Sequence, residues 1–387
     1  MAERSAALGY AALAKEATKG TAVTPTIYVP YYEQKIATDP NLVADMPVYG
    51  GKYRTYQALQ GQRSHKGTIK VMAEPNTTGY WLDMLLKRTN TTGANPYTHT
   101  FDHSADSNSY TMDISLVSQV VRFFGVQASK LIPSFSGDEM QHDITVSALG
   151  SFYGAEVASV ATTTVTLVTT HDPAPTTGLV VGDLVKVTKT DGSVSTNFTI
   201  SSLTPTTVTL NATAAAFAAG DMLVLRPATP SFSLLTPFLW PTTQFCFGAT
   251  ASAALSATQT RLESGSQIEI NHDFEDDNGS KRSGSYDPAS LVRTVGDASF
   301  KIKQYFDNPD QLKQWLATAK NACVMRAYSQ GTTYEFRVTL NNLKIATDAI
   351  ETKFGDVIYQ EEDYTSVYDS SDATGMTAVV INGISSI

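Results

Sequence analysis

The sequence contains little cysteine: among 387 residues only Cys246 and Cys323 occur, and no Cys-x-x-Cys pair is present. Both lie in apolar, strand-like segments, which predicts two buried free thiols; one disulfide between them is the alternative. The missing Cys-x-x-Cys pair argues against a structural zinc site. No apolar run is long enough to span a bilayer. Residues Met1 to Ser5 lack the apolar region of a signal peptide, so we expect the chain to fold in the cytoplasm.

Positive charge is also scarce. The chain has 28 Lys and Arg against 37 Asp and Glu, which gives a net charge of -9. A surface with this balance repels phosphate groups, and this argues against tight, sequence-independent binding to DNA. Ordinary solubility is the commonest reason for such a charge.

Motifs that assemble a catalytic or metal site are missing. No Gly-x-Ser-x-Gly elbow, phosphate-binding glycine loop or His-Glu-x-x-His sequence occurs. His99 and His103 lie four residues apart, a spacing that on a helix would allow both to bind one metal ion, but their segment reads as a strand ending in a turn. The acidic run from Asp273 to Asn278 lacks the alternate spacing and the distant Glu of a calcium loop. We therefore predict a protein that is not an enzyme, with no cofactor and no metal.

The residues that are abundant favour β-structure. Thr is frequent, and Val, Ile, Tyr and Phe recur in short runs separated by Gly, Asn, Asp and Pro. This is the composition of many short strands joined by turns. We expect a mainly β fold of sandwich-like or barrel-like domains, each with one flanking helix.

Residues 158–230 differ from the rest of the chain. They contain no Trp or Tyr and read as alternating strands with turns at Asp191-Gly192 and Gly220-Asp221. Thr-rich and Pro-containing segments bracket them, which favours an inserted, small, β-barrel-like domain. The alternative is that they continue one large sheet.

The two flanks of this insert, residues 1–157 and 231–387, resemble each other; they are called the N-terminal repeat and the C-terminal repeat below. A strand from Thr68 to Met72 matches one from Ser299 to Tyr305, with Ile-Lys-Val in the first and Phe-Lys-Ile in the second. A turn with proline and a helix follow each strand, and further strands follow each helix. The order of elements predicts a duplication.

The predicted helices share an apolar face that carries a Trp-Leu pair. In the first helix this face consists of Trp81, Leu82, Leu85 and Leu86, and in the second of Leu312, Trp315, Leu316 and Ala319. We expect Thr77 or Thr78 to cap the first helix. Asn308 is expected to cap the second, with Pro309 at its first position.

A long polar stretch precedes the first matched strand and another precedes the second: the first excursion (residues 45–66) and the second excursion (residues 271–297). Both mix tyrosine, arginine and glycine, a composition that suits a protein–protein contact, and long loops are usually functional. Plain loops with some core tyrosines are the alternative. We take as candidate contacts between subunits or rings the residues Tyr49, Tyr53, Arg54, Tyr56, Arg63, Asp276, Asp277, Arg282, Tyr286 and Arg293.

The N-terminal segment GYAALAKEATKGTAVTPTIYVPYYEQKI, with Gly20-Thr21-Ala22-Val23 before Pro25, resembles the start of tail tube proteins of bacteriophages with long, non-contractile tails. The segments YTHTFDHSADSNSYTMDI and FGVQASKLIPSFSGDEMQHDITVSALGSFYG are similar to the later strands of that family. The likeness covers most of residues 5–155 and is weaker over 265–387. Its motifs are degenerate, and the insert lies outside it.

The resemblance implies a structural virion protein that polymerises into stacked rings around a lumen. Strands of successive subunits would join into a continuous barrel, and the excursions would reach the adjacent ring. Implied partners are the chain itself, in rings of three chains with pseudo-six-fold symmetry, the tape-measure protein, the tail terminator and the distal tail proteins. DNA would pass through during ejection without sequence-specific binding, along a wall that an acidic surface suits. The protein would be located in the virion tail and be assembled in the host cytoplasm.

Two other function classes fit a β-rich chain of this length. One is a different virion structural protein, such as a head decoration or tail-fibre-associated protein. The other is a β-rich polysaccharide depolymerase, although no pair of catalytic carboxylates can be picked out.

Overall fold

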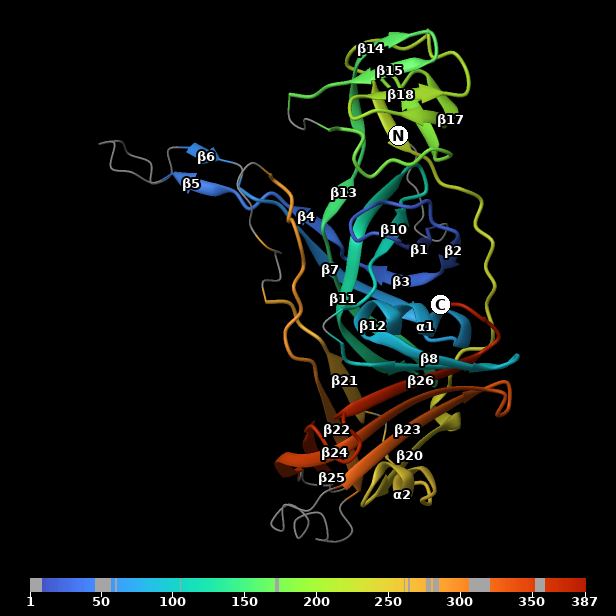
Figure 1. Cartoon of the computed structure of the whole chain (residues 1–387), viewed down its shortest axis with the longest axis vertical. Coiled ribbons are helices and arrows are strands. Elements are labelled where there is room, and N and C mark those ends of the chain that lie inside the picture. Colours follow the sequence, from blue (N-terminus) through green and yellow to red (C-terminus); the bar gives the residue numbers. More distant parts are fainter. Residues whose placement is uncertain are drawn as a thin grey trace.

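The computed structural model describes residues 9–45, 57–59, 61–104, 106–170, 174–260, 262–263, 265–275, 280, 285–305, 321–351 and 359–387. The fold is mainly β, with 53% strand and 6% helix, and it contains a closed barrel of six strands. This confirms the expected fold class at that level. In Figure 1 the barrel lies at one end of an elongated body, and the C-terminal repeat forms the other end.

The N-terminal repeat is organised around one long strand, β11. The first half of β11 pairs with β10 and β13, and β10 continues through β1 to β2. The second half pairs with β12, which pairs with β7, whose other edge carries β3 and β4. The bounds are β1 Ala11–Lys15, β2 Ile27–Val29, β3 Tyr31–Gln34, β4 Ala37–Asp39, β7 Ser64–Met72, β10 Tyr110–Ser115, β11 Val120–Ser136, β12 Glu139–Ala148 and β13 Gly150–Phe152.

The C-terminal repeat has the same order of strand pairing around its own long strand, β24. The first half of β24 pairs with β23 and β26, and β23 pairs with β20. The second half pairs with β25, which pairs with β22, and β22 pairs with β21. The bounds are β20 Thr243–Gly248, β21 Gln267–Asn271, β22 Asp297–Tyr305, β23 Asn321–Ser329, β24 Tyr334–Glu351, β25 Tyr359–Ser366 and β26 Met376–Asn382.

One helix, α1 (Pro75–Leu85), packs against β11 of the N-terminal repeat and against β24 and β26 of the C-terminal repeat, and all its residues are buried. The carboxylate of Glu74 caps it by accepting the backbone N–H groups of Asn76 and Thr77 at 3.0 and 2.6 Å. The expectation of a Thr77 or Thr78 cap was wrong, because Pro75 already occupies the first helical position and fixes Glu74 as the cap. The second expected helix lies outside the described residues. A short helix, α2 (Ala251–Leu255), and a 3-10 turn, η2 (Trp240–Thr242), flank β20.

The closed barrel is formed by residues 155–225, so it begins three residues before the predicted insert of residues 158–230. Its six strands pair in the order β14, β15, β18, β17, β16, β19 and back to β14. An apolar core fills it, separate from the main core; among the described residues, Val120 and Phe152 are the members of that core from outside residues 155–225. The bounds are β14 Ala155–Ala161, β15 Thr164–Leu167, β16 Leu184–Thr188, β17 Ser195–Leu203, β18 Thr207–Leu210 and β19 Met222–Leu225.

Three further features complete the arrangement. A hairpin of β8 (Lys87–Gly93) and β9 (Tyr97–Asp102) leaves the N-terminal repeat and pairs with β26 of the C-terminal repeat. A smaller hairpin of β5 (Val43–Asp45) and β6 (Gln57–Leu59) projects from one side of the body (Figure 1). Both cysteines are free and buried, which confirms the thiol prediction. Within the described part of the chain, no helix is long and apolar enough to cross a membrane.

Candidate assembly surfaces

The two repeats are joined edge to edge by a short seam between β11 and β21. Lys130 lies opposite Asn271 and Leu131 opposite Ile270, so one sheet runs in the order β3 and β4, β7, β12, β11, β21, β22, β25, β24. The backbone N–H of His272 donates to the Ser129 carbonyl at 2.8 Å. The Leu131 and Ile270 side chains are completely buried, so the seam is dry on its inner side.

Arg293, a predicted contact residue, is engaged inside the chain at this seam. Its guanidinium donates to the carbonyl oxygens of Met84, Ala128 and His272 at 2.6, 2.8 and 2.7 Å, and to the Ser107 hydroxyl at 2.6 Å. Burial lowers the pKa of Arg293 to about 9. Because three of these four acceptors, those of Met84, Ala128 and Ser107, belong to the N-terminal repeat, Arg293 holds the second excursion across the seam.

The two histidines considered for metal binding are held in different surroundings. His99 contacts the Thr91 hydroxyl at 3.0 Å and the Ile384 carbonyl at 2.8 Å. His103 contacts the Asn271 carbonyl at 3.1 Å, and its ring meets that of His272 edge to face at 5.2 Å. Burial lowers the pKa of His103, and that of His272 to about 4. Among the residues described, no group of three or more His, Cys, Asp or Glu is arranged to hold a metal.

The two excursions contact each other, which sequence reasoning did not predict. The Arg63 backbone N–H donates to the Tyr286 carbonyl at 2.7 Å, and its guanidinium carbon lies 5.9 Å from the centre of the Tyr286 ring. Asp287 accepts an ion pair from Arg63 at 3.5 Å and lies 3.2 Å from the imidazole of His65. The Tyr286 side chain remains half exposed, so the described contact between the two excursions lies at the surface.

The other predicted contact residues have no described position. Tyr49, Tyr53, Arg54 and Tyr56 of the first excursion lie outside the described residues. The same holds for Asp276, Asp277 and Arg282 of the second. Their role in contacts between subunits stays a prediction.

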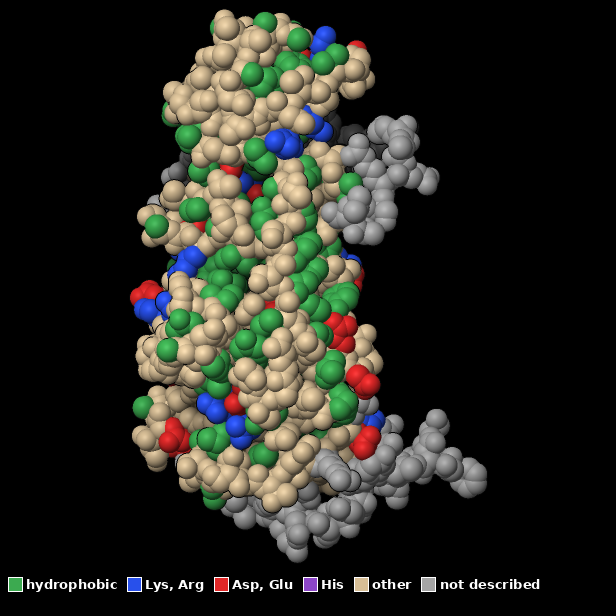
Figure 2. Space-filling model, turned by 90° about the vertical axis from the view of Figure 1, so that its right-hand side faces the viewer, with side chains coloured by type: hydrophobic (Ala, Val, Ile, Leu, Met, Phe, Trp, Pro, Cys, Tyr) green, Lys and Arg blue, Asp and Glu red, His purple; other side chains and the backbone are tan. Residues whose placement is uncertain are grey.

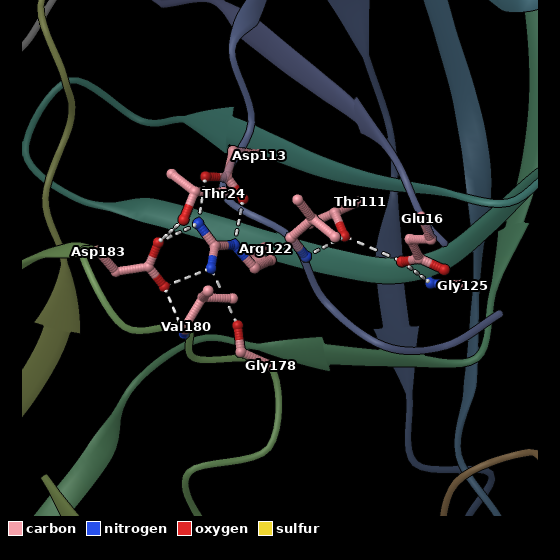
Figure 3. A network of polar contacts seen from close by, with 10 residues as sticks. Glu16, Thr24, Thr111, Asp113, Arg122, Gly125, Gly178, Val180 and Asp183 are labelled. Carbon is pink, nitrogen blue, oxygen red and sulfur yellow. Dashed lines mark hydrogen bonds and ion pairs between the residues drawn. The ribbon is translucent and has the colours of Figure 1, made fainter. Parts of the chain in front are cut away.

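A buried ionic bridge fastens the barrel to the body (Figure 3). Arg122, on β11, pairs with Asp113 of β10, where Nε and Nη2 donate to the two carboxylate oxygens at 2.7 and 2.9 Å. Its Nη1 and Nη2 also donate to Asp183, in the barrel, and Nη1 donates to the Gly178 carbonyl at 3.1 Å. Desolvation raises the pKa of Asp113 even though the guanidinium opposes this shift. The Arg122 guanidinium therefore pairs with two carboxylates, one from the body and one from the barrel.

A second buried carboxylate holds the N-terminal segment in place (Figure 3). Glu16 accepts the backbone N–H groups of Gly20 and Gly125, both at 2.8 Å, and the hydroxyls of Ser109 and Thr111 at 2.7 and 2.9 Å. Gly20 has a φ of 79°, which favours glycine. The Gly-Thr-Ala-Val segment is thereby anchored beside β10 and β11.

In the part of the chain that the structure describes, each end of the joined sheet has a strand that is paired along one edge. Among the described residues, β3 and β4 pair only with β7, and residues 344–351 of β24 pair only with β25. Strand edges of this kind present unpaired backbone groups that can accept another strand.

The face shown in Figure 2 carries a gathering of hydrophobic side chains along its middle. The connection from the barrel to β20 runs over this side of the body (Figure 1), and its Phe232 and Leu234 side chains are 42% and 39% exposed. No periodic pattern in the sequence indicated this surface, because the connection is extended and irregular.

The sequence matches no family model and no curated protein sequence.

Proposed function

We propose that this chain is a tail tube subunit of a long-tailed bacteriophage, a structural protein that forms stacked rings. One observation carries the proposal: two repeats with the same order of strand pairing are already joined edge to edge within the chain. A joined sheet with one open edge at each end is suited to closure by further copies. A closed ring removes those edges, which would otherwise favour uncontrolled association.

The proposed ring contains three chains. Each chain supplies two tube domains, so three chains supply six domains around the lumen. The number of strands in a closed barrel is linked to their tilt and stagger. Six chains would double the circumference and require a different tilt of every strand.

The remaining parts have roles in this arrangement. The joint surface of the two excursions would contact the adjacent ring. The barrel would decorate the outside of the tube. The lumen would hold the tape-measure protein during assembly and conduct DNA at ejection. The tail terminator and the distal tail proteins would cap the two ends.

Electron microscopy of the purified protein tests the proposal. Hollow tubes or stacked rings are expected, and a reconstruction should have three-fold symmetry with two non-identical domains alternating. Rings of six whole chains would overturn the three-chain ring. Discrete particles under all assembly conditions would contradict a tube subunit and favour another virion protein or a depolymerase.

A further inference from the structure

We infer that the contact between neighbouring chains repeats the internal seam, with Ile345 of one chain opposite Ile36 of the next and Lys344 opposite Ala37. The edge of β24 would pair with the edge formed by residues 34–38 of a second copy. This inference rests on the proposed ring, and it specifies both the strands and their register.

The position equivalent to Leu131 follows from the pairing within each repeat. In the N-terminal repeat, Ile69 pairs with Ile144, which pairs with Leu131. In the C-terminal repeat, Phe300 pairs with Tyr364, which pairs with Ile345. Because Ile69 and Phe300 begin the matching Ile-Lys-Val and Phe-Lys-Ile triplets, Ile345 is the counterpart of Leu131.

The position equivalent to Ile270 follows in the same way. Ile270 lies opposite Ala298, two residues before Phe300, and Gly67 lies two residues before Ile69. The register against β7 shifts between Tyr31 and Glu33 and is the same from Glu33 to Asp39, which places Ile36 opposite Gly67. Gly67 packs directly on this segment, since a Cβ there would lie 2.1 Å from the Lys35 carbonyl oxygen. Ile36 is therefore the counterpart of Ile270.

Burial supports the assignment. Leu131 and Ile270 are 0% exposed at the seam, where each covers the other strand. Their counterparts belong to the same apolar core but are less covered: Ile36 is 9% exposed and Ile345 is only partly buried. Pairing the two edges would complete the burial of both side chains in the way already seen inside the chain.

The side chains on the outer side of the seam differ between the two contacts. At the internal seam the Lys130 ammonium lies 2.6 Å from the Glu269 carboxylate. The counterparts of Lys130 and Glu269 are Lys344 and Lys35, which carry like charges, and Lys35 forms its own ion pair with Glu33, at 2.6 Å. Backbone hydrogen bonds and the isoleucine pair, not a salt bridge, would therefore stabilise the contact between chains.

A disulfide between chains tests the register. Residues directly opposite each other on antiparallel strands have Cβ atoms about 4.5–5.5 Å apart, close enough for a disulfide with a small adjustment. The variant A37C/K344C, assembled and then oxidised, should give covalent trimers as the largest product on a non-reducing gel. The native cysteines are buried and should not react.

Three controls define the outcome. The single variants A37C and K344C should give monomers on the gel, and their tubes should be visible by electron microscopy. In T38C/K344C the first cysteine points to the opposite face of the sheet, so no cross-link is expected. Ile345→Asp should stop ring closure while leaving circular dichroism unchanged, whereas Val181→Asp, on the exposed surface of the barrel, should assemble normally.

The possible failures are distinguishable. If tubes form but A37C/K344C does not cross-link, or T38C/K344C does, the register is overturned and the tube function stands. Covalent products of six chains would retain the strand pairing and overturn the three-chain ring. If the single variants and the unmodified protein form neither rings nor tubes, both the register and the proposed function are overturned.

Discussion

Arg122→Met is expected to cost about 3–5 kcal/mol of stability, because it leaves two buried carboxylates without a cation. The Arg122 side chain is 2% exposed, and those of Asp113 and Asp183 are 13% and 1% exposed. Met fills a similar volume, so the loss reports on charge and hydrogen bonding and not on a cavity. A domain is stable by only about 5–15 kcal/mol, so such a loss is large.

The bridge joins the barrel to the body, and the assay must show where the loss occurs. Native-state hydrogen exchange of peptides from residues 155–225 and from β10 and β11 measures opening at both ends of the bridge. Exchange of peptides distant from the bridge, such as those from β23, should change less. The stability that Arg122→Met loses relative to the unmodified protein should become smaller as the pH is lowered toward 5. Desolvation raises the pKa of Asp113, and without the opposing guanidinium this pKa rises further, so the native state binds more protons than the unfolded state and gains stability as the pH falls.

A matched control separates this effect from the loss of any ion pair. The Lys70 ammonium lies 3.1 Å from Asp143, and both side chains are about one-third exposed. Lys70→Met should therefore cost less than about 1 kcal/mol. The triple variant R122M/D113N/D183N should recover at least about 2 kcal/mol relative to Arg122→Met, since no buried charge remains. Equal effects of Arg122→Met and Lys70→Met, or no recovery in the triple variant, would refute the reasoning.

Three further predictions concern assembly and pH. The barrel can be removed by linking Glu156 to Met222, which pair directly, through Asn-Gly; Val120→Thr and Phe152→Ser replace the two apolar side chains that this exposes. Tubes of this variant should form with a narrower outer profile, and loss of folding would show that the barrel is needed. Deleting residues 48–62 should leave a folded, soluble subunit that does not stack, and tubes from this variant would contradict the role of the first excursion. Burial lowers the pKa of His142 to about 3, so below pH 6.5 the unfolded state binds one more proton than the native state and stability falls. In urea unfolding, His142→Gln should therefore lose about 2 kcal/mol less stability than the unmodified protein between pH 6.5 and pH 5.

Much of the local structure could be predicted from the sequence. The alternation around Thr68–Met72 and Ser299–Tyr305 lies within β7 and β22, and the turn at Asp191-Gly192 separates β16 from β17. These predictions held because strand periodicity and glycine turns are local signals. The Glu74 cap was missed although Pro75 marked the first helical position, because a Glu cap is uncommon. Burial disfavours the charged carboxylate and raises the pKa of Glu74, while hydrogen bonds from Asn76 and Thr77 stabilise it.

Long-range pairing could not be predicted from the sequence. The hairpin of β8 and β9 reads as polar and exposed, yet it pairs with β26, at the other end of the chain. Likewise, the polar residues around Arg63 and Asp287 gave no sign that the two excursions contact each other. Register between distant strands depends on which faces the tertiary fold buries, and no local pattern encodes it.

The fusion of two repeats in one chain has a physical consequence for a ring. Joining subunits costs translational and rotational entropy at each contact between chains. An internal seam avoids that cost because its two edges are held at high effective concentration by the chain itself. Fusion also lets the two repeats diverge. Here the barrel follows β13 of the N-terminal repeat, and its first and last strands, β14 and β19, enter and leave side by side. A ring of three such chains would carry one barrel for every two domains, a spacing that identical single-domain subunits would not produce.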